Sequence, residues 1–314
     1  MTWSRGTAVL SAVGAAFLGS VAVAQEDPQL NDEPVPQAKK NVEFKVSGGG
    51  MHMFETNIDS GGDVEVSRFS LGINAKSQIE RDLELNLGAS FLWSEYNFSG
   101  DTALGGPDPW TSVQTLDLSA IFNWGVSDDW TIFGGPIFGF SRESGADFGD
   151  SFTGGGLVGA SFVAGPDLVL GGGFGMTTRL EDSLRVFPVI VVEWQITNDV
   201  RLSSSVPAMA GRTIGMELVY DLGGGWETAL GGGYEFHRFR LDDDGQAPEG
   251  VGQDTSIPFW VRLTYGTDDN FRLNFMGGFV GTGELNLDSN VGTPITEENY
   301  DAAFIVGASA SIAF

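Results

Sequence analysis

From residue 42 to the last residue, apolar and polar side chains alternate in short runs. Leu83-Glu84-Leu85-Asn86-Leu87 and Phe271-Arg272-Leu273-Asn274-Phe275 are clear examples. A period of two places successive side chains on opposite faces of an extended strand. The pattern therefore predicts an all-β domain over residues 42–314.

Two kinds of connection separate these runs, and they alternate strictly along the chain. The first kind is tight and rich in Asp, Asn and Gly, which suit short hairpin turns: residues 80–82, 127–129, 165–167, 197–199, 223–225 and 267–270. The second kind is longer and more polar: residues near 55–63, 99–112, 142–151, 180–183, 205–212, 242–255 and 282–299. Short turns at one end and long loops at the other are typical of outer-membrane β-barrels.

Six turns and seven loops join 14 strands, and we predict a transmembrane antiparallel up-and-down β-barrel of that size. An even number of strands brings both chain ends to the periplasmic side. The run at 200–205 is short and stands before Pro207, so a barrel of 12 strands is the alternative.

The last run ends on an aromatic residue, Phe314. Phe304, Val306 and Ile312 share its face, and small residues occupy most of the other face. This ending resembles the C-terminal signal of bacterial outer-membrane barrels. The resemblance implies that the barrel assembly machinery reads Phe314 as an assembly signal.

The N-terminal region agrees with an exported protein. Residues 1–24 predict a signal peptide, with Arg5 before a short apolar run and Ala22-Val23-Ala24 as the cleavage site. Residues 25–41 contain three prolines and mixed charges without periodicity, so we expect a disordered periplasmic linker. The chain has no cysteine, which excludes disulfides, thiolate metal sites and lipid attachment through cysteine.

The alternation also predicts which face of each strand meets lipid. Leu116, Leu118 and Phe122 oppose Asp117, and a charge facing mid-bilayer lipid costs about 2–4 kcal/mol. The charged face should therefore line the lumen. The lumen-lining candidates are Arg68, Lys76, Asp117, Arg185, Glu193, Glu217, Glu227, Glu235, His237, Arg262 and Arg272. Opposite charges on neighbouring strands can fix the shape of the wall, and they can also filter solutes by charge.

The formal net charge is −26, and much of it falls in the predicted extracellular loops. The loops, together with Asp301 just after the last one, hold 20 of the 42 acidic residues but only Arg142 and Arg212 of the 16 basic ones. Such a surface attracts cations, and divalent cations are possible partners at the acidic loops. It argues against nucleic acid as a partner, because nucleic-acid binding needs a basic surface.

Signatures of catalysis or cofactor binding are weak. Gly149-Asp150-Ser151 matches the opening of a family of serine esterases, but the Asp-x-x-His partner of that motif is absent. His52 and His237 are the only histidines, and His237 is followed by Arg238 rather than by Ser-Asn as in phospholipase-type barrels. We predict no enzyme and no cofactor, with a barrel hydrolase as the least favoured alternative; the sequence leaves a metal site undecided.

Several short motifs resemble an uncharacterised, porin-like family of Gram-negative outer-membrane β-barrels over roughly residues 110–314. They are Phe187-Pro188-Val189-Ile190, Trp194, Asn198-Asp199, Arg201-Leu202, Val206-Pro207, Gly232-Gly233-Tyr234, Arg238 and Arg240-Leu241. The resemblance implies location and fold only. Two functions stay open: a passive channel for small solutes with a preference for cations, or a non-channel barrel whose acidic loops bind surface partners or cations.

Overall fold

The structure is a computed structural model that describes residues 13–14, 42–105, 108–181, 183–205, 213–267 and 270–314. Apart from β1 (Val13–Gly14), which pairs with Val189 and Ile190, the predicted signal peptide and linker lie outside the described residues. So do Asp182 and Arg212 of the predicted loops. In the described part of the chain, no helix has the length and hydropathy to cross a bilayer.

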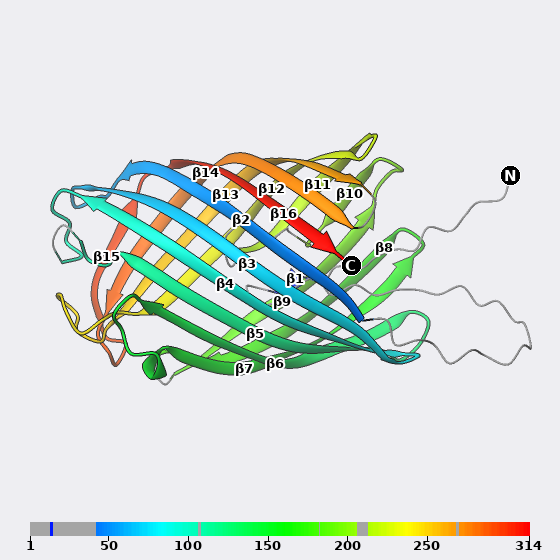
Figure 1. Cartoon of the computed structure of the whole chain (residues 1–314), viewed down its shortest axis with the longest axis horizontal. Helices are drawn as coiled ribbons and strands as arrows, with labels where there is room; N and C mark the ends of the chain where they lie inside the picture. Colours follow the sequence, from blue (N-terminus) through cyan, green and yellow to red (C-terminus); the bar gives the residue numbers. More distant parts are fainter. Residues whose placement is uncertain (1–12, 15–41, 106–107, 182, 206–212, 268–269) are drawn as a thin grey trace, which may run out of the picture.

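Fourteen strands form one closed antiparallel barrel, as predicted, and the alternative of 12 strands is wrong. The strands are β2 (Val42–Asn57), β3 (Asp63–Glu80), β4 (Leu83–Ser99), β5 (Ser112–Gly125), β6 (Trp130–Glu143), β7 (Phe152–Gly165), β8 (Leu168–Thr178), β9 (Leu184–Gln195), β10 (Val200–Ser203), β11 (Thr213–Gly223), β12 (Trp226–Arg240), β13 (Val251–Thr267), β14 (Phe271–Asp288) and β16 (Ala303–Ala313). Strand β16 pairs with β2 from Ile305↔Met53 to Ala313↔Lys45 and closes the ring. Figure 1 shows these two strands side by side.

The two ends of the barrel differ as the connections predict. The C terminus and the tight turns lie at one end, and the short 3-10 helix η1 (Gly149–Ser151) and the longer loops lie at the other (Figure 1). The β11–β12 turn needs glycine, because Gly223, Gly224 and Gly225 all have φ between +64° and +83°. We call the end with the longer loops the mouth. The extra strand β15 (Pro294–Tyr300) pairs with β14 at this end, outside the ring.

The outer face carries the apolar side chains that the alternation predicts. On β3, Phe69 and Leu71 are 62% and 65% exposed, whereas Arg68, which points to the opposite face of the same strand, is buried. Large exposed apolar side chains recur around the wall, and Trp124, Trp130, Trp194 and Trp226 stand near strand ends on the exposed surface. A closed single-chain barrel with this apolar band and aromatic residues at its edges has the architecture of bacterial outer-membrane proteins. The chain is therefore an outer-membrane barrel of the Gram-negative type, in contact with membrane lipid.

The wall is irregular near β10, which has only four residues. Strand β11 pairs with β12 up to Thr213↔Glu235, and β12 continues beyond that point to Arg240. There Arg240 forms a parallel bridge with Arg142 at the end of β6, six strands away around the ring. The upper end of β12 therefore crosses the mouth. This crossing places β12 where it can contact loops from several parts of the barrel.

Candidate functional site: the barrel interior and its mouth

The interior at the mouth is filled by a hydrophobic cluster, which we call the mouth core. Leu104 and Trp110 enter it from the loop after β4, and Ala247 enters from the loop after β12. The Trp110 ring packs edge-on against Tyr96 and Phe239, with ring centroids 6.0 Å and 5.5 Å apart. Each of these five residues is buried, so loops and strand ends together close this end of the interior.

Below the mouth core, Arg68 forms the centre of a buried ionic network. Its Nη1 donates to Glu235 Oε2 at 2.9 Å and its Nη2 donates to Asp254 Oδ2 at 2.6 Å. The hydroxyls of Tyr96 and Tyr300 donate to the two oxygens of Asp254, at 3.0 Å and 3.1 Å. Three strands separate β3 from β13 around the ring, so these side chains meet across the interior.

The remaining mouth-side candidates lie along the upper part of β12 or in contact with it. Thr213 Oγ1 donates to Glu235 Oε1 at 2.7 Å, and His237 Nε2 lies 4.0 Å from the other oxygen of Glu235. The guanidinium of Arg185, on β9, lies 3.5 Å from the centroid of the Phe236 ring. Glu235, His237 and Arg185 thus cluster around the upper part of β12.

A second buried network links β11 and β13 across the intervening strand β12, at a glycine that has no side chain to block the contact. Arg262 donates from Nε to Glu217 Oε1 at 2.9 Å and from Nη2 to Oε2, and Trp260 Nε1 donates to Oε1 at 2.7 Å. Gly231 of β12 lies in register between Glu217 and Trp260. A Cβ on Gly231 would lie 2.4 Å from the Trp260 ring, so only glycine lets the indole cross β12 to reach Glu217.

A row of polar side chains continues from this network around the wall. Thr264 Oγ1 donates to Asn274 Oδ1 at 2.7 Å, and Asn274 Nδ2 donates to Ser309 Oγ at 3.0 Å. These three buried residues belong to β13, β14 and β16. The row ties three neighbouring strands together on the interior face.

The charged candidates near the tight turns are more hydrated. Lys76 Nζ lies 2.9 Å from Glu84 Oε2, and Arg201 donates to both oxygens of Glu227 at 3.0 Å. Arg272 Nη1 lies 3.6 Å from the same Glu227 carboxylate. Side-chain exposure is 42% for Arg272 and 22% for Lys76, compared with 1% for Glu217 and 3% for Arg262 farther in. Water therefore reaches the interior from the tight-turn end.

The two other candidates lie on β9 and β5. Glu193 Oε1 accepts a hydrogen bond of 2.7 Å from Ser203 Oγ, and Asp117 is buried. The buried face of the wall from β5 to β9 carries an apolar cluster of Ile121, Phe133, Ile137, Leu157, Val169, Phe187, Val189 and Val191, with buried polar residues such as Asn123, Ser161 and Thr177 beside it. The ion pairs of Arg68 and Arg262 lie on the other side of the interior.

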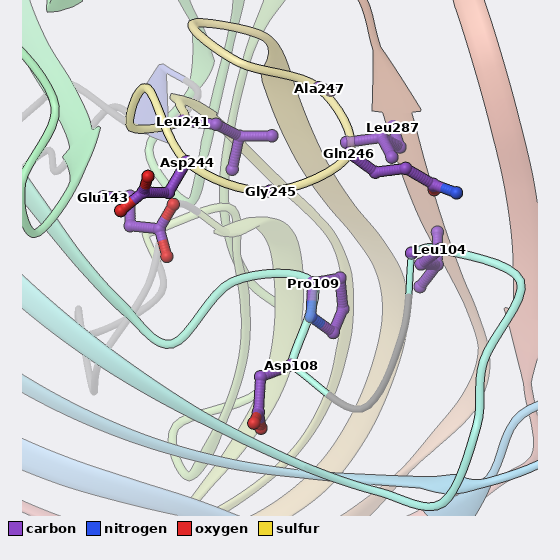
Figure 2. A pocket seen from close by; sticks show the side chains of 11 residues that line it. Leu104, Asp108, Pro109, Glu143, Leu241, Asp244, Gly245, Gln246, Ala247 and Leu287 are labelled. Carbon is purple, nitrogen blue, oxygen red and sulfur yellow. The ribbon is translucent and has the colours of Figure 1, made fainter.

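Glu143 fastens two loops at the mouth. One carboxylate oxygen accepts a hydrogen bond of 3.0 Å from the Thr111 amide, and the other accepts one of 3.3 Å from the Asp242 amide. A small cavity of about 20 Å³ lies beside it, between the loop that carries Leu104 and the loop that carries Gln246. Figure 2 shows these two loops facing each other across the cavity.

Glu143 is the last residue of β6, level with polar outward residues such as Gln114, and so lies beyond the apolar band. Burial raises the pKa of its carboxyl, and the negative charge of Asp242 adds to this effect. The amide hydrogen bonds act in the opposite direction but do not cancel the burial. The carboxyl therefore holds its proton more strongly in the folded mouth than in water.

Arg240 holds three loops through their carbonyl groups, and one of them is the loop that carries Asp242. It donates from Nε to Asp150 O at 3.2 Å, from Nη1 to Glu249 O at 2.7 Å, and from Nη2 to Leu180 O. Its neighbour on the same face, Arg238, bonds the side chains of Glu181, Gln253 and Asp288. In the sequence, both arginines stood only among the family-like motifs, and neither was predicted as a site residue. The sequence did contain a signal: both arginines occupy positions of β12 that the alternation assigns to the outward face. A charge on that face is tolerated only above the apolar band, so both residues had to lie at the mouth.

The loop boundaries predicted from sequence also need correction. Strand β13 begins at Val251 and β14 extends to Asp288, so Asp254, Glu284 and Asp288 lie on strands and not in loops. The ion partner of Arg68 was therefore missed, because Asp254 was assigned to the solvent-exposed surface. Across the residues that the structure describes, no group of three or more His, Asp and Glu side chains is placed to hold a metal ion.

The fold is similar to those of solved outer-membrane proteins. An outer-membrane channel from Pseudomonas putida F1 aligns with a TM-score of 0.48 and 11% identity, over 90% of this chain and 100% of that chain. A Pseudomonas aeruginosa FadL homologue gives 0.47 and 10%, over 87% and 90%, and the P. putida toluene transporter TodX gives 0.44 and 9%, over 88% and 90%. No protein-family model and no curated protein matches the sequence. At these identities, no residue role is carried over.

Proposed function

We propose that the chain is a passive outer-membrane channel for small solutes whose mouth is closed in this conformation. The supporting observation is the gradient of hydration along the interior. Charged side chains near the tight turns are partly exposed, those farther in are buried and paired, and the mouth core fills the far end. An interior that is wet at one end and closed by loops at the other fits a channel that opens when its loops move.

We further propose that the open channel prefers cations. The acidic mouth loops raise the local concentration of cations, whereas the interior charges largely neutralise each other as Arg68 with Asp254 and Arg262 with Glu217. Selectivity then comes from the mouth. It should weaken with salt, since a surface field is screened over about 8–10 Å near physiological ionic strength.

Single-channel recording in planar bilayers tests both parts. We expect stepwise conductance and a reversal potential that favours cations at low salt. Replacing Asp242, Asp243 and Asp244 together by Asn should reduce this preference. The control for total charge is a variant that removes three charges at the exposed tight-turn residues 128, 129 and 167. This control should have the smaller effect on cation preference. Arg262→Ala should change conductance more than the salt dependence. A preference for anions at low salt would show that the interior arginines set the selectivity.

The second candidate is a non-channel barrel that binds cations or surface partners through its acidic loops. The observation that favours it is the mouth core, whose 19 buried residues stabilise the closed end as a hydrophobic core does. An absence of conductance, including in variants whose mouth loops are loosened by Arg240→Ala, would support this alternative.

A further inference from the structure

The outer face of the barrel carries a serine, a histidine and a glutamate in the order of a hydrolytic triad. His52 Nδ1 lies 3.0 Å from Ser67 Oγ, and His52 Nε2 lies 3.9 Å from Glu65 Oε1. His52 of β2 and Ser67 of β3 are direct register partners in adjacent strands. Glu65 precedes Ser67 by two residues and shares its face.

This arrangement suits general-base activation of the serine. A neutral imidazole that keeps its proton on Nε2, facing the Glu65 carboxylate, presents the Nδ1 lone pair to the Ser67 hydroxyl. The carboxylate then stabilises the imidazolium that forms when Nδ1 accepts the serine proton. The 3.9 Å separation is longer than a hydrogen bond, and catalytic contacts of this kind shorten when substrate binds.

The neighbourhood holds the imidazole in place while leaving it accessible. The ring of Phe54 meets the His52 ring edge-on, with centroids 4.8 Å apart at 84°. The side chains of His52 and Glu65 are each 34% exposed. The site is thus half-buried against the wall and open to molecules outside the barrel.

The position of Ser67 defines the kind of substrate. Its neighbours Val66 and Arg68 are buried, so Ser67 points outward, and Phe69 and Leu71 follow it on the same face at 62% and 65% exposure. Gly50 and Gly48 are the register partners of Phe69 and Leu71. The triad therefore lies at the mouth-side edge of the apolar band, where the ester groups of outer-leaflet lipids meet their acyl chains.

We propose that Ser67, His52 and Glu65 form a second site, separate from the channel, that hydrolyses the acyl ester of a membrane lipid. Ser67 Oγ attacks the ester carbonyl carbon while His52 takes the hydroxyl proton. The carbon–oxygen bond to the alcohol breaks, His52 returns the proton to the leaving oxygen, and an acyl-serine remains. Water, deprotonated by His52, then releases the fatty acid and restores Ser67. The acyl chain would lie along Phe69 and Leu71.

The motif search that predicted a non-enzymatic barrel could not detect this site, since His52 and Ser67 are 15 residues apart and form no local signature. They meet only through the register of β2 with β3. The hydrolase considered from sequence placed its histidine at His237, which lies inside the barrel beside Glu235. The outer-face site uses the other histidine of the chain and none of the interior residues.

The test uses the full-length protein folded in mixed micelles and measures release of free fatty acid. One set of micelles contains phosphatidylethanolamine and the other contains lipid A, which distinguishes the two sources of acyl ester. Ser67→Ala should reduce release to background, and Glu65→Gln should lower it by up to about 10⁴-fold, as loss of the triad acid does elsewhere. Ser77→Ala, on the same face of β3 and opposite Val42, is the matched control and should behave as wild type.

Reaction with a fluorophosphonate provides a second readout, because it labels an activated serine without a lipid. We expect label on Ser67, lost in His52→Gln and kept in Ser77→Ala, with heat-modifiable gel migration reporting that each variant is folded. The proposal would be overturned if the wild-type protein released no fatty acid from either lipid and also took up no label. Equal activity in Ser67→Ala and Ser77→Ala would do the same. Neither result depends on whether the barrel conducts.

Discussion

The buried pair of Glu217 and Arg262 offers a quantitative test of how the interior is stabilised. We consider Glu217→Met and Arg262→Met separately and together, because methionine is flexible and fills similar space. In the first variant, Arg262 loses two charge-assisted hydrogen bonds and Trp260 loses the acceptor of its indole N–H. In the second, the Glu217 carboxylate, 1% exposed, loses its counter-charge.

The burial of both partners sets the magnitude. Removing one member of a buried ion pair costs about 3–5 kcal/mol, because the other charge stays desolvated. We expect each single variant to lose free energy of folding in that range. Replacing both charges removes the unpaired ion, so the double variant should lose less than either single variant. Arg201→Met is the matched control: Arg201 makes the same two-bonded contact with Glu227, but the pair is hydrated and should contribute about 1 kcal/mol or less.

Urea titration of folding into lipid vesicles measures these differences directly. Each single variant should differ clearly from Arg201→Met, and the loss in the double variant should not equal the sum of the two single losses. Single losses below about 1 kcal/mol, or additive losses, would mean that water or relaxation of the wall solvates the remaining charge.

Three further predictions follow from other contacts. Gly231→Ala should destabilise the barrel, because its Cβ would overlap the Trp260 ring, whereas Gly277→Ala, with no atom within 4 Å of its Cβ, should fold as wild type in the same titration. Deleting Phe314 should lower the yield of barrel in the outer membrane without affecting export, measured by fractionation, since the assembly machinery is expected to read the last strand; unchanged yield would contradict this. Burial raises the pKa of Glu143, so its proton is favoured in the closed mouth. Closure should therefore strengthen as pH falls through this raised pKa and weaken as pH rises through it, and recordings of Glu143→Gln should lose that dependence.

The sequence predicted the barrel well because its signals are local. Tight turns such as Gly223-Gly224-Gly225 fix the hairpins, and the period of two decides which side chains face lipid. Contacts that cross the interior could not be derived in this way. The bond from Arg68 to Asp254 depends on the exact start of β13, and on the bending of 14 strands into one ring.

Contacts at the mouth and on the outer face could not be derived from local sequence patterns either. The bridge between Arg240 and Arg142 joins residues that are 98 positions apart in sequence, because β12 extends past its last pair with β11 while its other edge stays paired with β13. The contact of His52 with Ser67 lies within one hairpin, yet it depends on the register, which an irregularity between Met53 and Thr56 shifts. Local patterns identify the faces of strands, whereas closure and register decide which residues on those faces meet.

The three carbonyl groups held by Arg240 have a consequence for recognition from outside the cell. Asp150, Leu180 and Glu249 belong to three different loops, and each loop is fixed to the same guanidinium. An antibody or a bacteriophage tail protein would therefore meet one assembled surface and not separate flexible peptides. Synthetic peptides copied from a single loop should be poor mimics of that surface. Antibodies raised against the folded barrel should lose binding when the protein is denatured.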